Sequence, residues 1–370
     1  MIDPHSPPVN TRLGFHYFPD SLHYREADLH TWLPILCALG ASWVTLLTPL
    51  ERAIPELFLR GLITAGIEPI LHLNPSLSNP PCHADIDLLF RAYASWGVHY
   101  ILLFDRPNSM HAWGPEAWSK DNLVERFLDI YLPISDIASQ TGLVPVFTPL
   151  EPGGDFWDIA FLSLALEGIR RRGDPRLLER LVLSAYAQPD YKPVNWGAGG
   201  PERWPGAKPY ITCNDTQDEC GFRIFDWYLA IAQSVIGFAP QVILLGGIYQ
   251  PADCLDFCIP VLDETIQAQQ ILSIAPGLTG GYLKTFSKNP TRTYLPDWAD
   301  PIPAEVLACN FWLLSASSDS PHAHTAWFQP DGHVLPVASA LKRWMDEQRT
   351  CGFLDNPSQG NGTIVATQSS

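Results

Sequence analysis

Two carboxylates follow neighbouring predicted strands and could act as a catalytic pair, Asp105 and Glu151. Hydrolysis of a glycosidic bond generally needs two carboxyl groups, one protonated to assist the leaving group and one ionised as nucleophile or base. Glu151 lies between Leu150 and Pro152, and an apolar setting raises a carboxyl pKa, as a general acid requires. Asp105 precedes Arg106, whose charge would keep it ionised where the two side chains meet.

Neighbouring strands lie about 4.8 Å apart, which predicts a separation of about 5–9 Å between the two carboxyl groups. This range includes both the retaining and the inverting geometry, so the sequence leaves that choice open. The alternative is structural: an ion pair of Arg106 with Asp105, or of an arginine with Glu151, fixes the top of the fold. Arg106 could instead bind a carboxylate on the ligand, such as a uronic acid.

Aromatic, amide and imidazole side chains accompany these carboxylates in the segments that follow the predicted strands. Flat rings suit the apolar faces of sugars, and Asn, Asp, His and Arg supply donors and acceptors for the hydroxyl groups. Any single ring could simply pack at the top of the fold, but the set predicts a carbohydrate ligand. The residues predicted to bind it are His16, Tyr17, His72, Asn74, Arg106, Asn108, Trp113, Asp155, Trp157, Tyr186, Asn195, Trp196, Trp204, Tyr249, Gln250 and Trp312.

A metal site is weakly supported. His322 and His324 share one loop, and Cys254 and Cys258 stand at helical spacing. Loop histidines are usually solvated, and no CxxC pair or nearby His supports a site at the cysteines. The sequence also holds no GxSxG elbow, HExxH helix, Walker loop or strand-bound GxGxxG. We therefore expect neither a metal nor a cofactor.

The elements that position these residues repeat eight times along the chain. Each time, a short apolar, β-prone run precedes a stretch with helical spacing, which predicts βαβ units and a parallel sheet. Eight units in 370 residues predict one α/β domain, a closed (β/α)8 TIM barrel whose active site lies at the C-terminal ends of the strands. The predicted strands are Leu13–Phe18, Trp43–Leu47, Pro69–Leu73, Tyr100–Phe104, Val144–Phe147, Leu181–Tyr186, Val242–Leu245 and Val306–Leu314.

Two connections are long, Ala187–Gly221 after the sixth strand and Pro276–Pro303 before the eighth. Their aromatic residues argue against disorder, so we predict ordered segments over the barrel mouth. Asp155 precedes an apolar run and is predicted to cap the fifth helix. Residues 1–11 are predicted to form an N-terminal extension, residues 12–350 the barrel, and residues 351–370 a disordered tail.

The composition excludes several classes of partner. The net charge is −16, from 23 basic and 39 acidic residues, and such a surface repels nucleic acid and anionic membranes. No apolar run approaches the length of a membrane span, and the first twelve residues lack a signal-peptide core. The eight cysteines are scattered, as is usual in a reducing compartment. We therefore expect a cytoplasmic protein with a neutral or cationic ligand, and the oligomeric state stays open.

Three segments give the chain a resemblance to the clan-A glycoside hydrolases, the cellulase-like barrel superfamily. In that clan the fourth strand commonly ends in Asn-Glu-Pro, where the Glu is the acid/base, a second Glu ends the seventh strand as nucleophile, and a Trp often follows the eighth. Trp312 matches this Trp, and the stretch around Trp327 is similar to the closing stretch of such enzymes. In Asp105–Asn108, however, Arg106 stands in the acid/base position, and Gly246–Gln250 holds no Glu. Over about residues 12–348 the resemblance implies the barrel and a sugar-like ligand, but not the clan's retaining mechanism.

Two functions of different class follow from these residues. The first is a divergent glycoside hydrolase that uses Glu151 with Asp105 as its partner. The second is a catalytically inactive barrel that binds a glycan through the same aromatic and polar side chains. A third, less supported function is a lyase or other enzyme acting on a uronic acid, with Arg106 as the anchor.

Overall fold

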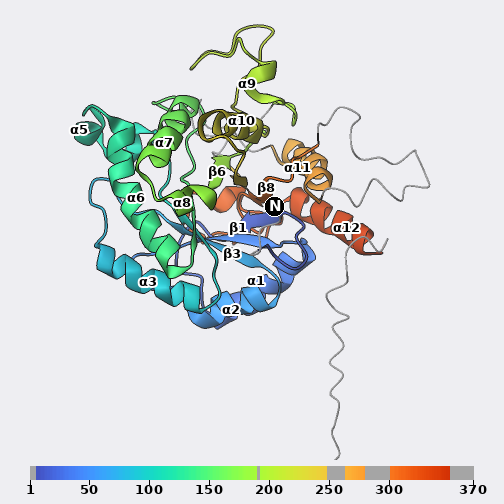
Figure 1. Cartoon of the computed structure of the whole chain (residues 1–370). Helices are drawn as coiled ribbons and strands as arrows, with labels where there is room; N and C mark the ends of the chain where they lie inside the picture. The colour runs from blue at the N-terminus through green and yellow to red at the C-terminus, as the bar shows by residue number, and fades with distance from the viewer. Residues whose placement is uncertain (1–5, 190–191, 248–262, 280–300, 351–370) are drawn as a thin grey trace, which may run out of the picture.

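The structure is a computed structural model of the chain, and it describes residues 6–189, 192–247, 263–279 and 301–350 (Figure 1). Eight parallel strands form one closed barrel in which each strand pairs with its sequence neighbours and β8 pairs with β1. The predicted (β/α)8 fold is confirmed. The strands are β1 Leu13–His16, β2 Trp43–Leu47, β3 Glu68–Leu73, β4 Tyr100–Leu103, β5 Val144–Val146, β6 Val182–Tyr186, β7 Gln241–Leu245 and β8 Val306–Phe311.

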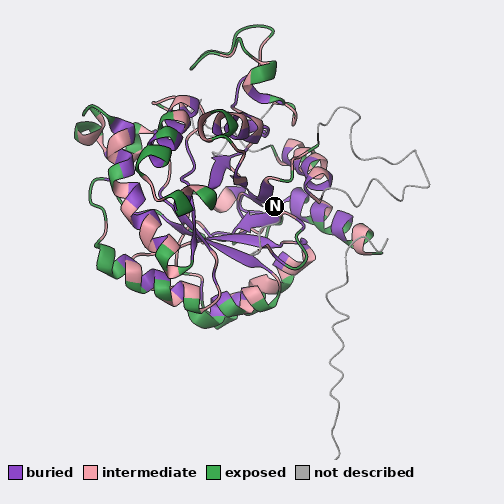
Figure 2. Cartoon of the chain, viewed as in Figure 1, coloured by how far each residue is buried: buried purple, intermediate pink, exposed green. Residues whose placement is uncertain are grey.

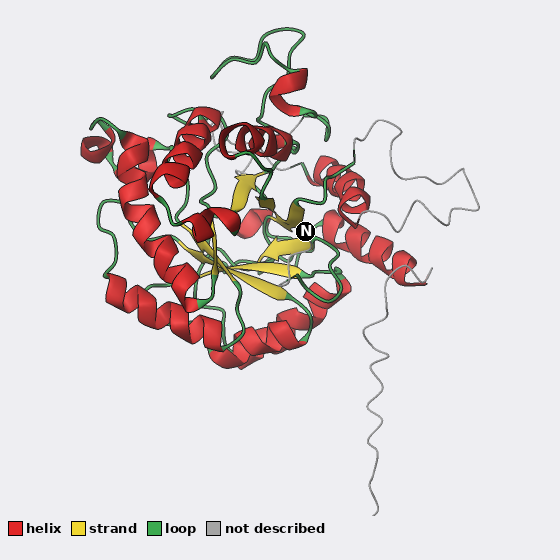
Figure 3. Cartoon of the chain, in the orientation of Figure 1, coloured by secondary structure: helices red, strands yellow, loops and turns green. Residues whose placement is uncertain are grey.

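Helices surround the barrel on the outside (Figure 3). The long ones are α1 Glu26–Ala38, α2 Glu56–Thr64, α3 His83–Ser95, α6 Leu123–Thr141, α7 Asp158–Arg172, α10 Ile224–Ile236, α11 Glu264–Thr279 and α12 Pro336–Thr350. The short ones are α4 Met110–Trp113, α5 Pro115–Trp118, α8 Pro175–Glu179, α9 Gly200–Arg203 and the 3-10 turn η2 Ala323–Thr325. Within the described residues, no helix is both long and apolar enough to span a membrane.

The alternation of side chains along each strand builds two apolar layers. Trp43 and Tyr100 pack edge to face inside the barrel, with ring centroids 5.3 Å apart. Val44 and Leu46 point the other way, into the larger layer between the strands and the helices. Figure 2 shows the same arrangement: the strands are buried, and the long helices around the barrel carry both buried and exposed residues.

Several strands are shorter than the apolar runs that predicted them. β1 ends at His16, and β8 ends at Phe311. β4 ends before Phe104, whose φ of 65° lies in the left-handed region and takes the chain out of the sheet. The apolar runs therefore extend past the strands because their last residues pack at the barrel mouth rather than pair.

Pairing is uneven around the barrel. β2 and β3 are in register at every residue from Trp43 to Leu47, whereas β5 and β6 share the single pair Val146–Val182. Hydrogen bonds from Phe147 N to Val182 O (2.8 Å) and from Ser184 Oγ to Phe147 O (2.5 Å) supplement that pair. The β5–β6 seam is therefore the least paired part of the wall.

The residues before β1 close the end of the barrel that lies at the N-terminal ends of the strands, opposite the mouth. Thr11 Oγ1 donates to Gly40 O at 2.7 Å, and Ser42 Oγ donates to Val9 O at 2.8 Å. Trp43 Nε1 donates to Asn10 Oδ1 at 2.8 Å. These bonds join the segment before β1 to the start of β2, so this end is sealed and the C-terminal end carries the loops.

Gly14 is the residue that lets β1 pass beside β8. A Cβ atom at Gly14 would lie 2.2 Å from Asn310 Oδ1 and 2.8 Å from Trp43 Cβ. We expect Gly14→Ala to lower the free energy of unfolding by about 1–3 kcal/mol, because a packed interior accommodates an added methyl poorly. Urea denaturation measures this. Gly206→Ala, whose Cβ would meet only Thr216 at 3.9 Å, is the control and should change stability by less than about 0.5 kcal/mol; equal effects would contradict the packing argument.

Candidate functional site

Four side chains from the ends of β4, β5 and β6 form an ion-pair cluster at the C-terminal mouth, here called the Arg106 cluster: Asp105, Arg106, Glu151 and Tyr186. Arg106 Nη1 lies 2.9 Å from Asp105 Oδ2, and Arg106 Nε pairs with Glu151 Oε2. The guanidinium carbon lies 4.0 Å from the centroid of the Tyr186 ring, and the Tyr186 hydroxyl donates to Asp105 Oδ1 at 2.7 Å. One cation therefore compensates both carboxylates that were predicted to act in catalysis.

The charge state of the cluster follows from its burial. Burial by itself lowers the pKa of Arg106, but Tyr186, Asp105 and Glu151 together raise it above its ordinary value. Burial also raises the pKa of Tyr186 well above its ordinary value. At physiological pH, Arg106 is therefore a cation and Tyr186 a neutral hydroxyl that donates.

Backbone strain brings Arg106 across the mouth. Phe104 and Arg106 have φ angles of 65° and 44°, a region that costs a non-glycine residue roughly 1–3 kcal/mol. Arg106 N donates to Pro149 O at 2.9 Å, and Phe104 N donates to Leu73 O at 2.8 Å. Such strain often marks a functional segment, and here it positions the guanidinium between β5 and β6.

Asn108 holds the loop that carries Glu151. Its Nδ2 donates to Glu151 O (2.8 Å) and to Phe156 O (3.0 Å), and its Oδ1 accepts from Glu151 N at 2.8 Å. Asn108 is fully buried, and both ends of its amide are occupied by backbone. Its place in the structure is thus that of a support for Glu151.

The prediction that Glu151 lies in an apolar environment is wrong. The Glu151 side chain is 44% exposed and forms an ion pair with Arg106. The flanking Leu150 is fully buried, but it points away from Glu151 into the layer beneath the helices. Adjacent residues of an extended chain face opposite sides, so an apolar neighbour in sequence did not become an apolar environment in space.

Two neutral histidines lie deeper in the barrel. His16, at the end of β1, lies 5.2 Å from Trp312 between ring centroids, and its buried Nε2 has no hydrogen-bond partner among the described residues. Burial, with His72 and Arg106 nearby, lowers the pKa of His16 to about 3. Burial also lowers the pKa of His72, whose Nε2 lies 2.9 Å from Phe104 O. Both rings are uncharged at neutral pH.

A cleft of about 740 Å³ lies beside the Arg106 cluster. One wall is the loop between β5 and α7, and the other belongs to the connection between β6 and α10. Glu151 is the member of the Arg106 cluster that lines it. The cleft is lined by Ser109, Glu151, Pro152, Gly153, Gly154, Asp155, Lys192, Lys208, Tyr210, Ile211, Thr212, Asp218, Glu219 and Cys220. Its lining is rich in hydroxyl, carboxylate and ammonium groups, with one exposed aromatic ring, that of Tyr210.

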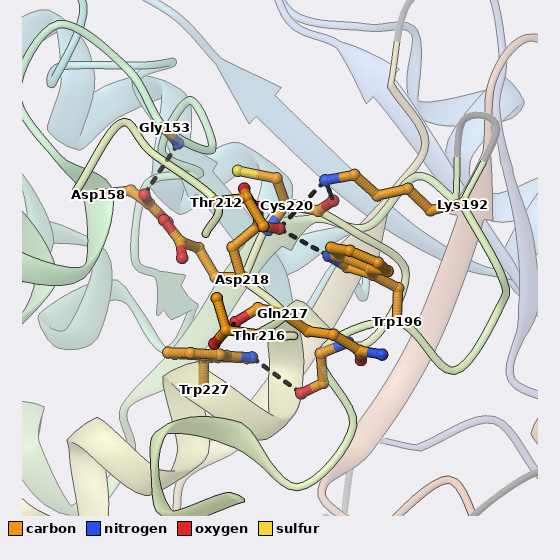
Figure 4. Close-up of polar contacts among 12 residues, drawn as sticks. Gly153, Asp158, Lys192, Trp196, Thr212, Thr216, Gln217, Asp218, Cys220 and Trp227 are labelled. Carbon is orange, nitrogen blue, oxygen red and sulfur yellow. Dashed lines mark hydrogen bonds and ion pairs between the residues drawn. The ribbon is translucent and has the colours of Figure 1, made fainter. Parts of the chain in front are cut away.

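The β6–α10 connection is held by partly or fully buried polar bonds (Figure 4). Asp218 Oδ1 accepts from Trp196 Nε1 at 2.7 Å and from Lys192 Nζ at 3.1 Å. Lys192 Nζ also donates to Cys220 O at 2.5 Å, and Trp227 Nε1 of α10 donates to Gly197 O at 2.9 Å. Trp196 thus has its indole nitrogen turned to Asp218, within the connection itself.

The other predicted binding residues are spread over several environments. Tyr17 is buried, and its ring packs on Tyr24 and Phe58. Trp113 is buried and donates from Nε1 to Pro107 O at 2.7 Å. These two rings belong to the packing of the barrel wall and do not line the cleft.

The remaining predicted residues lie nearer the surface. Asn74 is exposed after β3, and Asn195 is half-buried in the β6–α10 connection. Trp204 donates from Nε1 to Ala198 O at 3.0 Å, again within that connection. Trp157 donates from Nε1 to Glu219 Oε1 at 2.5 Å. Tyr249, Gln250, Cys254, Cys258, most of the segment Pro276–Pro303 and the tail 351–370 lie outside the described residues.

The predicted cap of the fifth helix is wrong. This helix, α7, begins at Asp158, and its N-cap is Trp157, which makes no side-chain cap. Asp155 instead accepts a hydrogen bond from Met110 N at 2.7 Å and lines the cleft. The apolar run begins before the helix because Phe156 packs on Phe161, ahead of the first turn.

Two buried carboxyl groups were not predicted as site residues, Asp158 and Glu219. They are 0% and 3% exposed and lie next to each other. Asp158 reads in sequence as an ordinary acidic residue of a first helical turn, and Glu219 lies in a polar loop 61 residues later. No sequence signal joins them.

The described residues hold no group of three or more His, Cys, Asp or Glu side chains arranged to bind a metal. Within the same part of the chain, five cysteines are free: Cys37, Cys82, Cys213, Cys220 and Cys309. Burial raises the pKa of Cys220 and of Cys309, so these two are protonated thiols rather than metal-binding thiolates.

Comparison with known proteins relates the chain to others through its fold. No protein-family model matches the sequence, and no curated protein sequence matches it. Among solved structures, a family 39 glycoside hydrolase from the gut symbiont Bacteroides cellulosilyticus WH2 is similar with a TM-score of 0.53 at 9% identity. The match covers 93% of this chain and 64% of that enzyme, so the chain spans less than two thirds of the enzyme's length.

Two family 128 structures are also similar, at lower scores. An oligosaccharide-binding protein from Trichoderma gamsii (subgroup VII) has a TM-score of 0.46 at 12% identity, over 94% of this chain and 98% of its own. An endo-β-1,3-glucanase from Sorangium cellulosum (subgroup II) has a TM-score of 0.48 at 11% identity, over 89% and 97%. At these identities the likeness concerns the barrel fold and does not extend to the site.

Proposed function

We propose that this protein is a glycoside hydrolase-like TIM barrel that binds a neutral carbohydrate at its C-terminal mouth without hydrolysing it. The observation that carries the proposal is the Arg106 cluster. A retaining or inverting hydrolase needs one carboxyl group that can give up a proton and one that is free to act as nucleophile or base. Here a single guanidinium binds both Asp105 and Glu151, so both carboxyl groups are engaged in ion pairs and neither is free.

The charge of the cluster points to the class of sugar. Arg106 is the cation that could have bound a uronic acid, but its donors already contact Asp105 and Glu151. Two carboxylates against one guanidinium leave a net charge of about −1, which repels an anionic ligand. A neutral oligosaccharide fits better, with its hydroxyl groups on Glu151 and Asp155 of the cleft.

A second candidate function, hydrolysis by Glu151 with Asp105, is favoured by one observation. Glu151 lines the cleft and is nearly half-exposed, so a ligand can reach its carboxylate. Hydrolysis would require the ligand to displace Glu151 from Arg106 and let it take up a proton. We also propose a cytoplasmic location, which is compatible with both functions and does not distinguish them.

Glu151→Gln separates the two functions. Binding of a panel of neutral oligosaccharides is measured by calorimetry, and turnover is measured on the matching aryl glycosides. We expect wild type to bind at least one sugar without turnover, and Glu151→Gln to bind it about tenfold more weakly, because a charge-assisted hydrogen bond becomes a neutral one. Glu125→Gln, which alters a surface carboxylate paired with Arg171 and Arg172, is the control and should bind like wild type.

The outcomes assign the function clearly. Turnover by wild type that Glu151→Gln removes would overturn the binding proposal and establish the hydrolase. Turnover that survives in Glu151→Gln would remove Glu151 from catalysis and overturn both proposals for this residue. No binding and no turnover on any neutral sugar would overturn the carbohydrate assignment.

A further inference from the structure

Asp158 and Glu219 form a buried carboxyl pair that joins two segments far apart in the chain. Asp158 is the first residue of α7, and Glu219 lies in the β6–α10 connection, one wall of the cleft. The two side chains lie next to each other and are almost completely excluded from solvent. Figure 4 shows the Asp158 carboxyl beside the segment that carries Asp218 and Cys220.

The other bonds of the pair determine where a proton must be. Asp158 Oδ1 accepts from Gly153 N at 3.0 Å, and Asp158 Oδ2 accepts from the Tyr228 hydroxyl at 3.2 Å. Glu219 Oε1 accepts from Trp157 Nε1 at 2.5 Å. An ionised carboxylate can only accept hydrogen bonds. Two ionised carboxylates next to each other in a buried position would repel each other, so the arrangement requires a proton on one of them.

No cation in the described part of the chain forms an ion pair with either carboxyl group. The nearest charged groups on the connection are Lys192 and Asp218, and these two pair with each other at 3.1 Å. Cys220 of the same connection and Tyr228 of α10 face the pair as a thiol and a hydroxyl, and burial raises the pKa of both. Among the described residues, a shared proton is thus what removes the repulsion between two carboxylates.

We propose that Asp158 and Glu219 share one proton and act as a proton-dependent latch, which fastens the β6–α10 connection to the start of α7 and opens when the proton is lost. The latch does not depend on which ligand the cleft takes. Asp218, Glu219 and Cys220 line one wall of the cleft and Gly153 the other. Loss of the proton therefore weakens the contact between the two walls, and alkaline pH is the condition that does so.

The direction of the pH effect follows from linkage. Burial, and next the charge of Glu219, raise the pKa of Asp158 well above its ordinary value. The folded protein then binds this proton more tightly than the unfolded chain does. The stabilisation is complete below about pH 4, the ordinary carboxyl range, and is lost as the pH rises through the folded-state pKa. A carboxylate in an ion pair shows the opposite pH dependence: it stabilises the folded protein at neutral pH and loses this stabilisation as the pH falls.

Glu219→Gln tests the latch directly, because its amide can donate the bond that the proton now supplies and can still accept from Trp157. Hydrogen–deuterium exchange of residues 208–221 is measured from pH 5 to pH 9 and corrected for the intrinsic rate. We expect wild-type protection to fall at least tenfold over this range, while Glu219→Gln stays protected throughout. Glu202→Gln, an exposed carboxylate in the same connection, is the matched control and should follow wild type.

A second measurement keeps the test decisive if the variant folds poorly. Infrared spectroscopy of the wild type at pH 6–7 should show the C=O stretch of one protonated carboxyl group, which disappears as protection is lost at higher pH. A wild type with no such band at pH 6–7 would overturn the shared proton. Equal pH dependence of protection in wild type and in folded Glu219→Gln would overturn the latch.

Discussion

Replacing Arg106 with methionine is expected to lower the free energy of unfolding by about 3 kcal/mol at pH 7. The substitution removes the guanidinium between Asp105 and Glu151, and it leaves two carboxylates close together at a mostly buried position. It also removes the contact with the Tyr186 ring. The expected loss is at the lower end for a broken buried pair, because solvent reaches Glu151. Chemical denaturation measures it.

A matched control variant identifies the cause of this loss. Arg172→Met is the matched control: Arg172 also pairs with two carboxylates, those of Glu125 and Asp129, but on the helix surface. It should cost less than about 1 kcal/mol. Equal losses in the two variants would show that the Arg106 cluster contributes no more to the free energy of unfolding than a surface ion pair.

The second large effect is expected at Trp327, where Trp327→Ala should cost about 3–5 kcal/mol. Trp327 is fully buried, its ring lies 4.9 Å from Phe15 and 5.9 Å from Phe311 between centroids, and it spans the junction of β1 with β8. Its Nε1 also donates to Trp312 O at 3.1 Å, so the same ring supports the mouth. Truncation leaves a cavity between the first and last strands.

Thermal and urea unfolding of two further variants complete the test at Trp327. Trp327→Phe keeps a ring in the stack but loses the bond to Trp312, and it should cost about 1 kcal/mol. Trp118→Ala, at a half-buried ring of α5, should cost clearly less than Trp327→Ala. If Trp118→Ala and Trp327→Ala destabilise alike, Trp327 does not close the barrel in the way its contacts indicate.

The fold could be predicted because each strand is fully buried in a parallel barrel and therefore reads as a short apolar run. The ends of the strands could not be predicted from the sequence, because residues such as Phe104 and Trp312 continue the apolar pattern after strand pairing has stopped. The pattern records burial, and burial continues into the mouth where the sheet hydrogen bonds end.

The site could be predicted only to the level of its position. Asp105, Glu151 and Tyr186 were expected at neighbouring strand ends, and the structure brings them together. That one guanidinium contacts both carboxylates depends on the left-handed backbone at Arg106, which no residue type there signals. The Asp158–Glu219 pair could not be predicted from the sequence, because tertiary packing brings the two residues together and no residue pattern links them.

The poorly paired seam between β5 and β6 has a mechanical consequence. Local opening needs the least free energy where the fewest hydrogen bonds must break, so the barrel wall opens most readily along this seam. The loops that follow β5 and β6 carry the two walls of the cleft. A molecule bound to both walls would oppose separation of β5 from β6. The barrel would therefore become more rigid as more of the cleft is occupied by ligand.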